Sequence, residues 1–181
     1  MKTPEYGNFE AMLAETRKES DRACALILAA NLDNRLRTFL CAFFVKITPS
    51  YKNQLFEGNG CLASFSSRIQ FSYVLGLIAE NEHHDLNIIR RIRNYFAHKE
   101  HGWSFHTQEI RDRCSSLQMI ARTKEDYPLL KVDLTNPRTE FEVTATSLSL
   151  LLMDRARVAE KEKRSLPHPS TILPAENHSN G

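Results

Sequence analysis

Apolar side chains recur every three or four residues along most of this chain, which is the spacing of one face of an α-helix. The longest such pattern predicts a helix over residues 21–47, with apolar positions at Leu28, Leu32, Leu36, Phe39, Leu40, Phe43, Phe44 and Ile47. Pro49 follows and is expected to stop this helix. A second strong pattern predicts a helix over residues 80–98, with Leu86, Ile89, Ile92 and Phe96 facing inward.

Capping residues and prolines predict further helices. We expect helices over residues 8–19 and 107–121, and a last long helix that opens at Asn136-Pro137. No segment alternates in the manner of a strand. The predicted fold is therefore all-α, a single-domain bundle of five to six helices over residues 1–164. Residues 165–181 contain three prolines and many polar residues, and we expect them to form a disordered tail.

The middle of the chain predicts one more helix and the turn before it. Ser64 or Ser66 is expected to start this helix, which carries Phe65, Ile69, Tyr73 and Leu77 on one side. A glycine inside a helix costs about 1 kcal/mol relative to alanine. Gly76, four residues after Ser72, therefore predicts a narrow strip where another helix packs closely.

The connection over residues 48–63 is expected to be a loop that ends in Glu57-Gly58-Asn59-Gly60. Two glycines around an asparagine permit a positive φ and a tight reversal of the backbone. Such a loop can also present bare N–H groups to an anion, but it lacks the GK[ST] of a phosphate-binding P-loop. A structural turn is the first interpretation, and an anion site is the alternative.

Composition restricts the class of protein. The chain is 41% hydrophobic and 25% charged, which is typical of soluble globular domains. Lys and Arg number 24 against 22 Asp and Glu, so no whole-molecule field would drive indiscriminate nucleic-acid binding. The chain begins without the apolar run of a signal peptide, and no apolar stretch reaches the roughly 18 residues that suggest a membrane span. We expect a cytoplasmic protein without a membrane partner.

Cysteines and histidines give no pattern of a metal site. Cys24, Cys41, Cys61 and Cys114 are widely spaced and form no CxxC pair, so we expect reduced cysteines. His83 and His84 are adjacent and lack the spacing by which two helical side chains ligate one metal ion. No metal and no cofactor are expected.

The segment richest in chemistry is Arg90-Arg91-Ile92-Arg93-Asn94-Tyr95-Phe96-Ala97-His98. A helix turns about 100° per residue, so Arg90, Asn94 and His98 are expected to form one polar stripe with Arg91 beside it. Arg93 falls at the edge of the apolar side, where its guanidinium is expected to need a carboxylate or carbonyl partner.

Arg93 and His98 resemble the Arg-x4-His spacing of HEPN-superfamily proteins, many of which are metal-independent ribonucleases. Cleavage of RNA by its own 2′-hydroxyl needs a proton-transfer group such as histidine, and a fixed cation such as arginine on the phosphate. Asn94 is placed to orient either group. On one unbroken helix Arg93 and His98 point about 140° apart, so they converge only if the helix ends near Ala97 or if two chains form a dimer. Without a substrate, a basic last turn simply suits the helix dipole.

Three segments together resemble the signature blocks of the mannitol operon repressor family, in the same order and at matching separations: residues 26–44, 55–78 and 85–98. The glycine loop and the residues after it are the most specific part, and Cys61 departs from the family pattern, in which we expect a proline. The resemblance implies an all-helical fold. It also implies a repressor-type regulator that has no recognisable DNA-binding domain and acts through a partner.

Two functional hypotheses follow. The first is a transcriptional regulator without its own DNA-binding motif that acts through protein partners. Its surface would centre on residues 55–64, including Glu57, Gly58, Asn59 and Gly60, and on Arg68, Arg90, Arg91, Asn94 and His98. The alternative is a HEPN-like endoribonuclease of toxin or phage-defence type that binds RNA and uses Arg93 and His98 across a homodimer. Direct sequence-specific DNA binding is not expected, because no recognition helix with base-reading side chains is evident.

Overall fold

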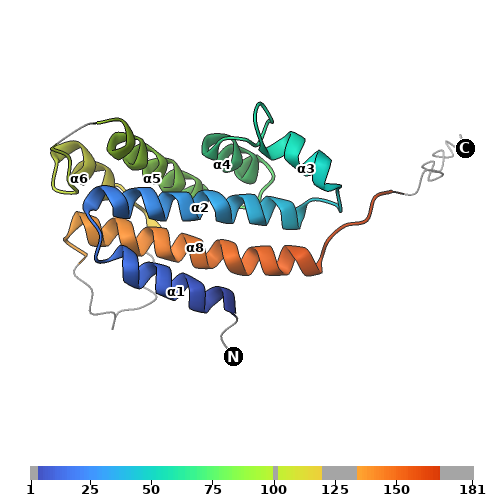
Figure 1. Ribbon diagram of the computed structural model, residues 1–181, viewed down its shortest axis with the longest axis horizontal. Helices are drawn as coiled ribbons and strands as arrows, with labels where there is room; N and C mark the ends of the chain where they lie inside the picture. The colour runs from blue at the N-terminus through green and yellow to red at the C-terminus, as the bar shows by residue number, and fades with distance from the viewer. Residues whose placement is uncertain (1–3, 100–101, 120–133, 168–181) are drawn as a thin grey trace, which may run out of the picture.

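The computed structural model describes residues 4–99, 102–119 and 134–167, and this part of the chain contains seven α-helices and no strand (Figure 1). The helices are α1 (Pro4–Thr16), α2 (Asp21–Phe43), α3 (Pro49–Phe56), α4 (Phe65–Val74), α5 (Glu80–His98), α6 (Gln108–Cys114) and α8 (Pro137–Lys161). The predicted all-α fold is confirmed. Most of the tail predicted to be disordered, residues 168–181, lies outside the described residues.

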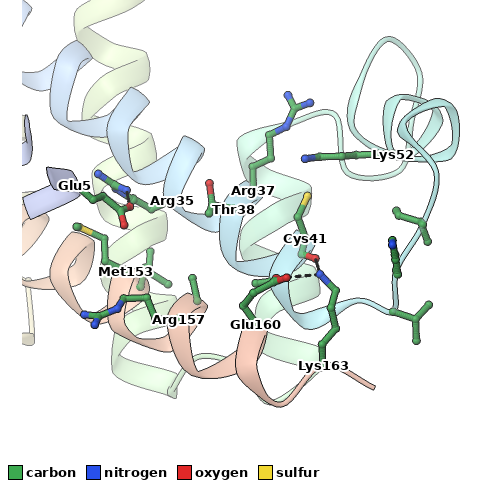
Figure 2. Close-up of a pocket in the computed structure, with 16 residues that line it drawn as sticks. Glu5, Arg35, Arg37, Thr38, Cys41, Lys52, Met153, Arg157, Glu160 and Lys163 are labelled. Atoms are coloured by element: carbon green, nitrogen blue, oxygen red, sulfur yellow. Dashed lines mark hydrogen bonds and ion pairs between the residues drawn. The ribbon is translucent and has the colours of Figure 1, made fainter. Parts of the chain in front are cut away.

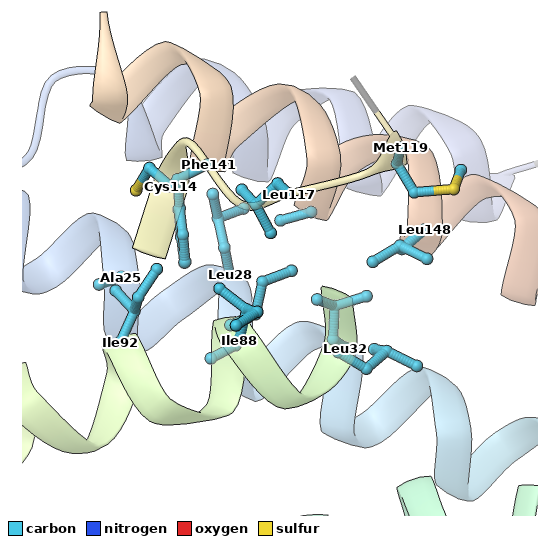
Figure 3. Packing of buried hydrophobic residues seen from close by; sticks show 14 of the residues in the cluster. Ala25, Leu28, Leu32, Ile88, Ile92, Cys114, Leu117, Met119, Phe141 and Leu148 are labelled. Atoms are coloured by element: carbon cyan, nitrogen blue, oxygen red, sulfur yellow. The ribbon is translucent and has the colours of Figure 1, made fainter. Parts of the chain in front are cut away.

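Two long helices, α2 and α8, lie side by side through the middle of the bundle, and α5 packs against both (Figure 1). Their facing side chains form the core in Figure 3, where the three helices contribute Leu28, Leu32, Ile88, Ile92, Phe141 and Leu148. Fully burying one such side chain contributes about 1.5–3 kcal/mol. Because α2 contributes buried residues along most of its length, it is the central element of the fold.

The predicted helix over residues 80–98 is confirmed at both ends as α5. Its first turn is fixed by Glu82, which is buried and accepts a hydrogen bond of 2.8 Å from the backbone N–H of Ala79. Arg155 of α8 donates two further hydrogen bonds to Glu82, of 2.5 and 2.7 Å. The buried carboxylate is therefore paired, and it joins α5 to α8.

The predicted boundary near residue 47 is wrong. Helix α2 ends at Phe43, and Pro49 begins a new helix, α3, in place of the expected loop. Thr48 caps α3 by accepting a hydrogen bond of 3.2 Å from Tyr51 N–H. A proline in the first turn of a helix loses no hydrogen bond, since those N–H groups have no partner within the helix.

The prediction that Gly76 lies inside a helix is also wrong. Ser64 caps α4 as expected, but the helix ends at Val74, and Gly76 has a φ of 69°. The N–H of Gly76 bonds to the Tyr73 carbonyl, and the N–H of Leu77 bonds to the Ser72 carbonyl, both at 2.9 Å. This pair of bonds is a Schellman motif, which needs the left-handed conformation that glycine adopts without strain.

Three other helix boundaries can be compared with the predictions. Helix α1 begins at Pro4, before the expected cap at Asn8, and α6 ends at Cys114, well before residue 121. The segment after α6 is held by Asp85, which accepts hydrogen bonds from the N–H groups of Gln118 (2.9 Å) and Met119 (2.8 Å). The start of α8 at Asn136-Pro137 is confirmed.

The turn between α1 and α2 is tied to the start of α8 by Arg138. Its guanidinium donates hydrogen bonds to the carbonyls of Thr16 (3.2 Å) and Glu19 (2.9 Å), and to the carboxylate of Asp21 (3.0 Å). Glu142, one turn further along α8, accepts another at 2.7 Å. A single arginine thus joins segments that are more than a hundred residues apart in the chain.

The four cysteines are all unpaired. Burial raises the pKa of the Cys24 and Cys114 thiols to about 12, so both remain protonated at neutral pH. Among the described helices, none has the length and apolar character needed to cross a membrane.

Candidate partner-binding surface

The loop before α4 is held from the inside by Arg68. This side chain is only 5% exposed, and it pairs with Asp33 of α2 at 2.5 Å. The same guanidinium donates hydrogen bonds to the carbonyls of Leu62 (2.9 Å) and Ala63 (3.1 Å), and it lies over the ring of Phe56. Arg68 therefore supports the loop and does not extend the exposed stripe in which the sequence places it.

The two glycines of the loop have different structural roles. Gly58 has a φ of 56° and open space around it. A Cβ on Gly60 would lie 2.3 Å from the Leu55 carbonyl oxygen and 2.4 Å from that of Gln54. Leu62 N–H donates a 2.9 Å bond to the same Leu55 carbonyl, which closes the loop on the end of α3. This geometry favours the structural turn over the anion site.

The remaining loop residues, Glu57 and Asn59, are exposed. Glu57 forms an ion pair of 2.6 Å with Arg37 of α2, so its charge is already matched. Of these two, Asn59 presents an exposed polar side chain that has no hydrogen-bond partner in the described part of the chain. The loop offers little surface for recognition, although its sequence is the most distinctive in the chain.

The polar stripe of α5 divides into two parts. Arg90 and Arg91 lie toward the α4 end, whereas His98 is the last residue of the helix, about 12 Å further on at 1.5 Å per residue. Arg93 is exposed, and its Nη1 donates to the side-chain carbonyl oxygen of Asn94 at 3.0 Å. Because α5 continues through His98, Arg93 and His98 do not converge within one chain.

A polar cleft of about 830 Å³ lies beside Arg90 and Arg91. Its other lining residues include Gln70, His83, His84, Asn87 and Gln118. Gln70 and Asn87 both approach His83 Nε2 at 3.1 Å, and His84 Nε2 lies 3.2 Å from the Ser116 carbonyl. The Nε of Arg90 is buried and has no hydrogen-bond partner among the described residues. No group of three metal-ligating side chains occurs in the described part of the chain.

An apolar surface adjoins this cleft at the end of α4. Four neighbouring large side chains are exposed there: Phe71 (39%), Tyr73 (38%), Val74 (74%) and Leu75 (41%). The Tyr73 ring stacks on His83, with centroids 4.3 Å apart, and so joins the apolar surface to the cleft. Tyr73 is therefore exposed, although the sequence spacing groups it with the buried Ile69.

Sequence reasoning missed this apolar surface, although a signal was present. Val74 lies nine residues after Phe65, which places it about 180° away on a helical wheel. A helix with apolar residues on opposite sides has more apolar surface than one core can cover. The Schellman motif at Gly76 then ends the helix with these side chains in solvent.

The sequence model of the mannitol repressor family, MtlR, matches residues 10–151. This chain belongs to the mannitol repressor family. The matched region extends from α1 into α8, and it includes the glycine loop, the apolar end of α4 and the whole of α5. The resemblance of the three sequence blocks to this family is confirmed, whereas the HEPN likeness of the Arg93–His98 spacing stays a prediction.

A solved structure supports the fold of this MtlR-family chain. The X-ray structure of the MtlR–HPr complex from Escherichia coli contains a chain of similar fold, with a TM-score of 0.60 and 18% sequence identity. The likeness covers 81% of this chain and 97% of the other. None of the curated proteins matches the chain.

Proposed function

We propose that this MtlR-family chain is a repressor-type regulator that acts by binding another protein and does not read DNA sequence itself. The observation that carries the proposal is the exposed apolar end of α4. Contiguous exposed apolar side chains mark interaction sites on soluble proteins. Here they adjoin a polar cleft with two arginines and two histidines, and an apolar centre with a polar rim is the usual anatomy of a protein interface.

HPr is the first candidate partner, because the similar MtlR of Escherichia coli forms a complex with HPr. A sequence identity of 18% indicates a shared fold only, so the partner of this chain needs its own test. The near balance of charge supports protein binding over DNA binding, since a net charge of +2 provides little attraction for a phosphate backbone.

The test compares two exposed valines. Val74→Glu places a charge in the α4 surface, and Val158→Glu makes the same change on α8, where Val158 is 52% exposed. We expect Val74→Glu to weaken HPr binding at least tenfold in isothermal titration calorimetry, which is about 1.4 kcal/mol or more. Val158→Glu should bind as the wild type does. Equal affinity of both variants would rule out the α4 surface, and absence of HPr binding by the wild type would rule out this partner.

A second candidate function is supported by a separate observation. Arg93, Asn94 and His98 are all accessible at one end of α5, and Arg93 is hydrogen-bonded to Asn94. Two chains joined at this end would bring two copies of the three residues together for metal-independent RNA cleavage. The purified protein would then cleave RNA in the presence of EDTA, and His98→Ala would abolish cleavage without unfolding. A monomer that cleaves none of a varied set of RNAs would exclude this function.

A further inference from the structure

A groove between α2 and α8 lies apart from the α4 surface. It encloses about 460 Å³ (Figure 2). Its floor is apolar and is built from Ala42, Val45, Leu152, Met153 and Ala156. Leu152 and Met153 are buried at its base. The groove lies between the second halves of α2 and α8, and the connection from α2 to α3 lines its far end together with Lys52 of α3.

The rim of this groove is basic. Its lining includes six basic residues, Arg35, Arg37, Lys46, Lys52, Arg157 and Lys163, against two acidic ones, Glu5 and Glu160. Figure 2 shows Lys52 and Lys163 at the end of the groove opposite Glu5 and Arg35. Lys46 and Lys52 form no ion pair with a described residue, and Lys52 is half-buried. Their positive charge is therefore available to an acidic ligand.

Helix α1 is an example of an acidic helix that packs against α2 and α8. It packs along the same helix pair (Figure 1), and its thirteen residues include three glutamates and no basic residue. Glu5 forms an ion pair with Arg35, and the Arg35 guanidinium lies 5.8 Å from the centroid of the buried Phe9 ring. Tyr6 donates a hydrogen bond of 2.6 Å to Asp154 of α8. An acidic amphipathic helix is thus already bound to α2 and α8 by ion pairs and apolar contacts.

Helix α1 begins at Pro4, beside Glu5 at one end of the groove, and no described segment covers the channel beyond it. The uncovered part has an apolar floor, and Lys46 and Lys52 provide positive charge there that no described residue pairs, whereas the other four basic residues of the rim form ion pairs. We propose that this part of the α2–α8 groove is a docking site for an acidic amphipathic helix of a second partner protein. The bound helix would lie beyond the start of α1, with its apolar face in the groove, as in other complexes in which a helix binds a hydrophobic groove.

This inference is independent of the proposed function, because the groove and the α4 surface share no residue. If both are correct, the protein has two separate binding sites. One site binds a partner through the end of α4, and the other holds a helix of a second protein.

The experiment uses the full chain and two synthetic peptides of about 14 residues. The first has leucines at i, i+3, i+4 and i+7 with glutamates elsewhere, and the second has the same composition in an order that spreads the leucines around the helix. Fluorescence anisotropy measures binding at low ionic strength. We expect the first peptide to bind at least tenfold more tightly than the second, and its affinity to fall as salt is added.

Two pairs of variants place the peptide in the groove. Lys46→Glu with Lys52→Glu should weaken binding at least tenfold, whereas Lys18→Glu with Arg111→Glu, which changes the net charge equally elsewhere, should not. Val45→Ser removes an apolar floor residue and should weaken binding, and Val158→Ser, outside the lining, should not. Circular dichroism confirms that each variant is folded.

Three outcomes would overturn the proposal. They are equal affinity for the two peptides, an equal loss in the two charge-reversed pairs, and no binding of the first peptide up to millimolar concentration. None of these results bears on HPr binding through Val74, so the two proposals succeed or fail separately.

Discussion

The loop before α4 and the end of α4 lie fifteen residues apart in the chain, yet they differ in what they contribute. The loop has the most distinctive sequence, but Arg68 holds it from inside and most of its polar groups are already matched. The end of α4 has an unremarkable sequence, but it exposes four large apolar side chains within five residues. A distinctive sequence can thus reflect the conformation that the backbone of a loop requires. A binding surface is recognised instead from the exposure of its apolar side chains in the folded structure.

The largest expected change in stability comes from removal of the Arg68 side chain. Arg68→Ala leaves the Leu62 and Ala63 carbonyls and the Asp33 carboxylate without their partner. We expect a loss of about 3 kcal/mol in the free energy of unfolding, measured by urea denaturation. Arg91→Ala, at an exposed position, should change it by less than about 0.5 kcal/mol. If both variants were equally stable, the structural role of Arg68 would be wrong.

The second test separates the two glycines of the loop. Gly60→Ala forces a methyl group against two backbone carbonyls that cannot move far, so we expect a loss of about 2 kcal/mol. Gly58→Ala meets only the cost of a positive φ, about 1 kcal/mol. Thermal unfolding of the two variants measures the difference. A Gly58→Ala protein less stable than Gly60→Ala would contradict the tight closure at Gly60.

The smallest expected effect lies at the end of α4. Val74→Glu should change the free energy of unfolding by less than about 0.5 kcal/mol, because the side chain is 74% exposed. The same variant should show the largest loss of partner binding. Asn59→Ala in the loop should change neither quantity. Loss of partner binding in Asn59→Ala would reverse the comparison and make the loop the recognition surface.

The sequence was sufficient to predict the elements whose local and tertiary preferences agree. Helix α5 has an acidic first turn, a regular apolar stripe and a basic last residue, and both of its ends were predicted. Pro49 was ambiguous, because a proline both ends one helix and begins the next. The four-residue spacing that groups Tyr73 with Ile69 could not reveal that Tyr73 is 38% exposed and stacks on His83.

The site was harder to predict than the fold. Arg68 and Arg90 are both basic residues on predicted helices. Only the folded structure shows that the loop before α4 encloses Arg68, whereas Arg90 borders the polar cleft. The neighbourhood of Tyr73 and His83 joins two helices across a turn, and no periodicity within one helix reports on such a contact. Exposure of Val74 was within reach of the sequence, since its place opposite Phe65 follows from helical geometry alone.

The contacts between Arg138 and the turn before α2 affect the order in which the protein folds during its synthesis. Arg138 and Asp21 are 117 residues apart, and the part of the α2 face that packs on α8 stays uncovered until α8 has been synthesised. Ribosomes add roughly 5–20 residues per second, so the nascent chain must wait on the order of ten seconds between the two helices. During that interval the unsheltered face of α2 is open to chaperones and to other nascent chains. Closure by Arg138 is then a late event in the folding of the chain.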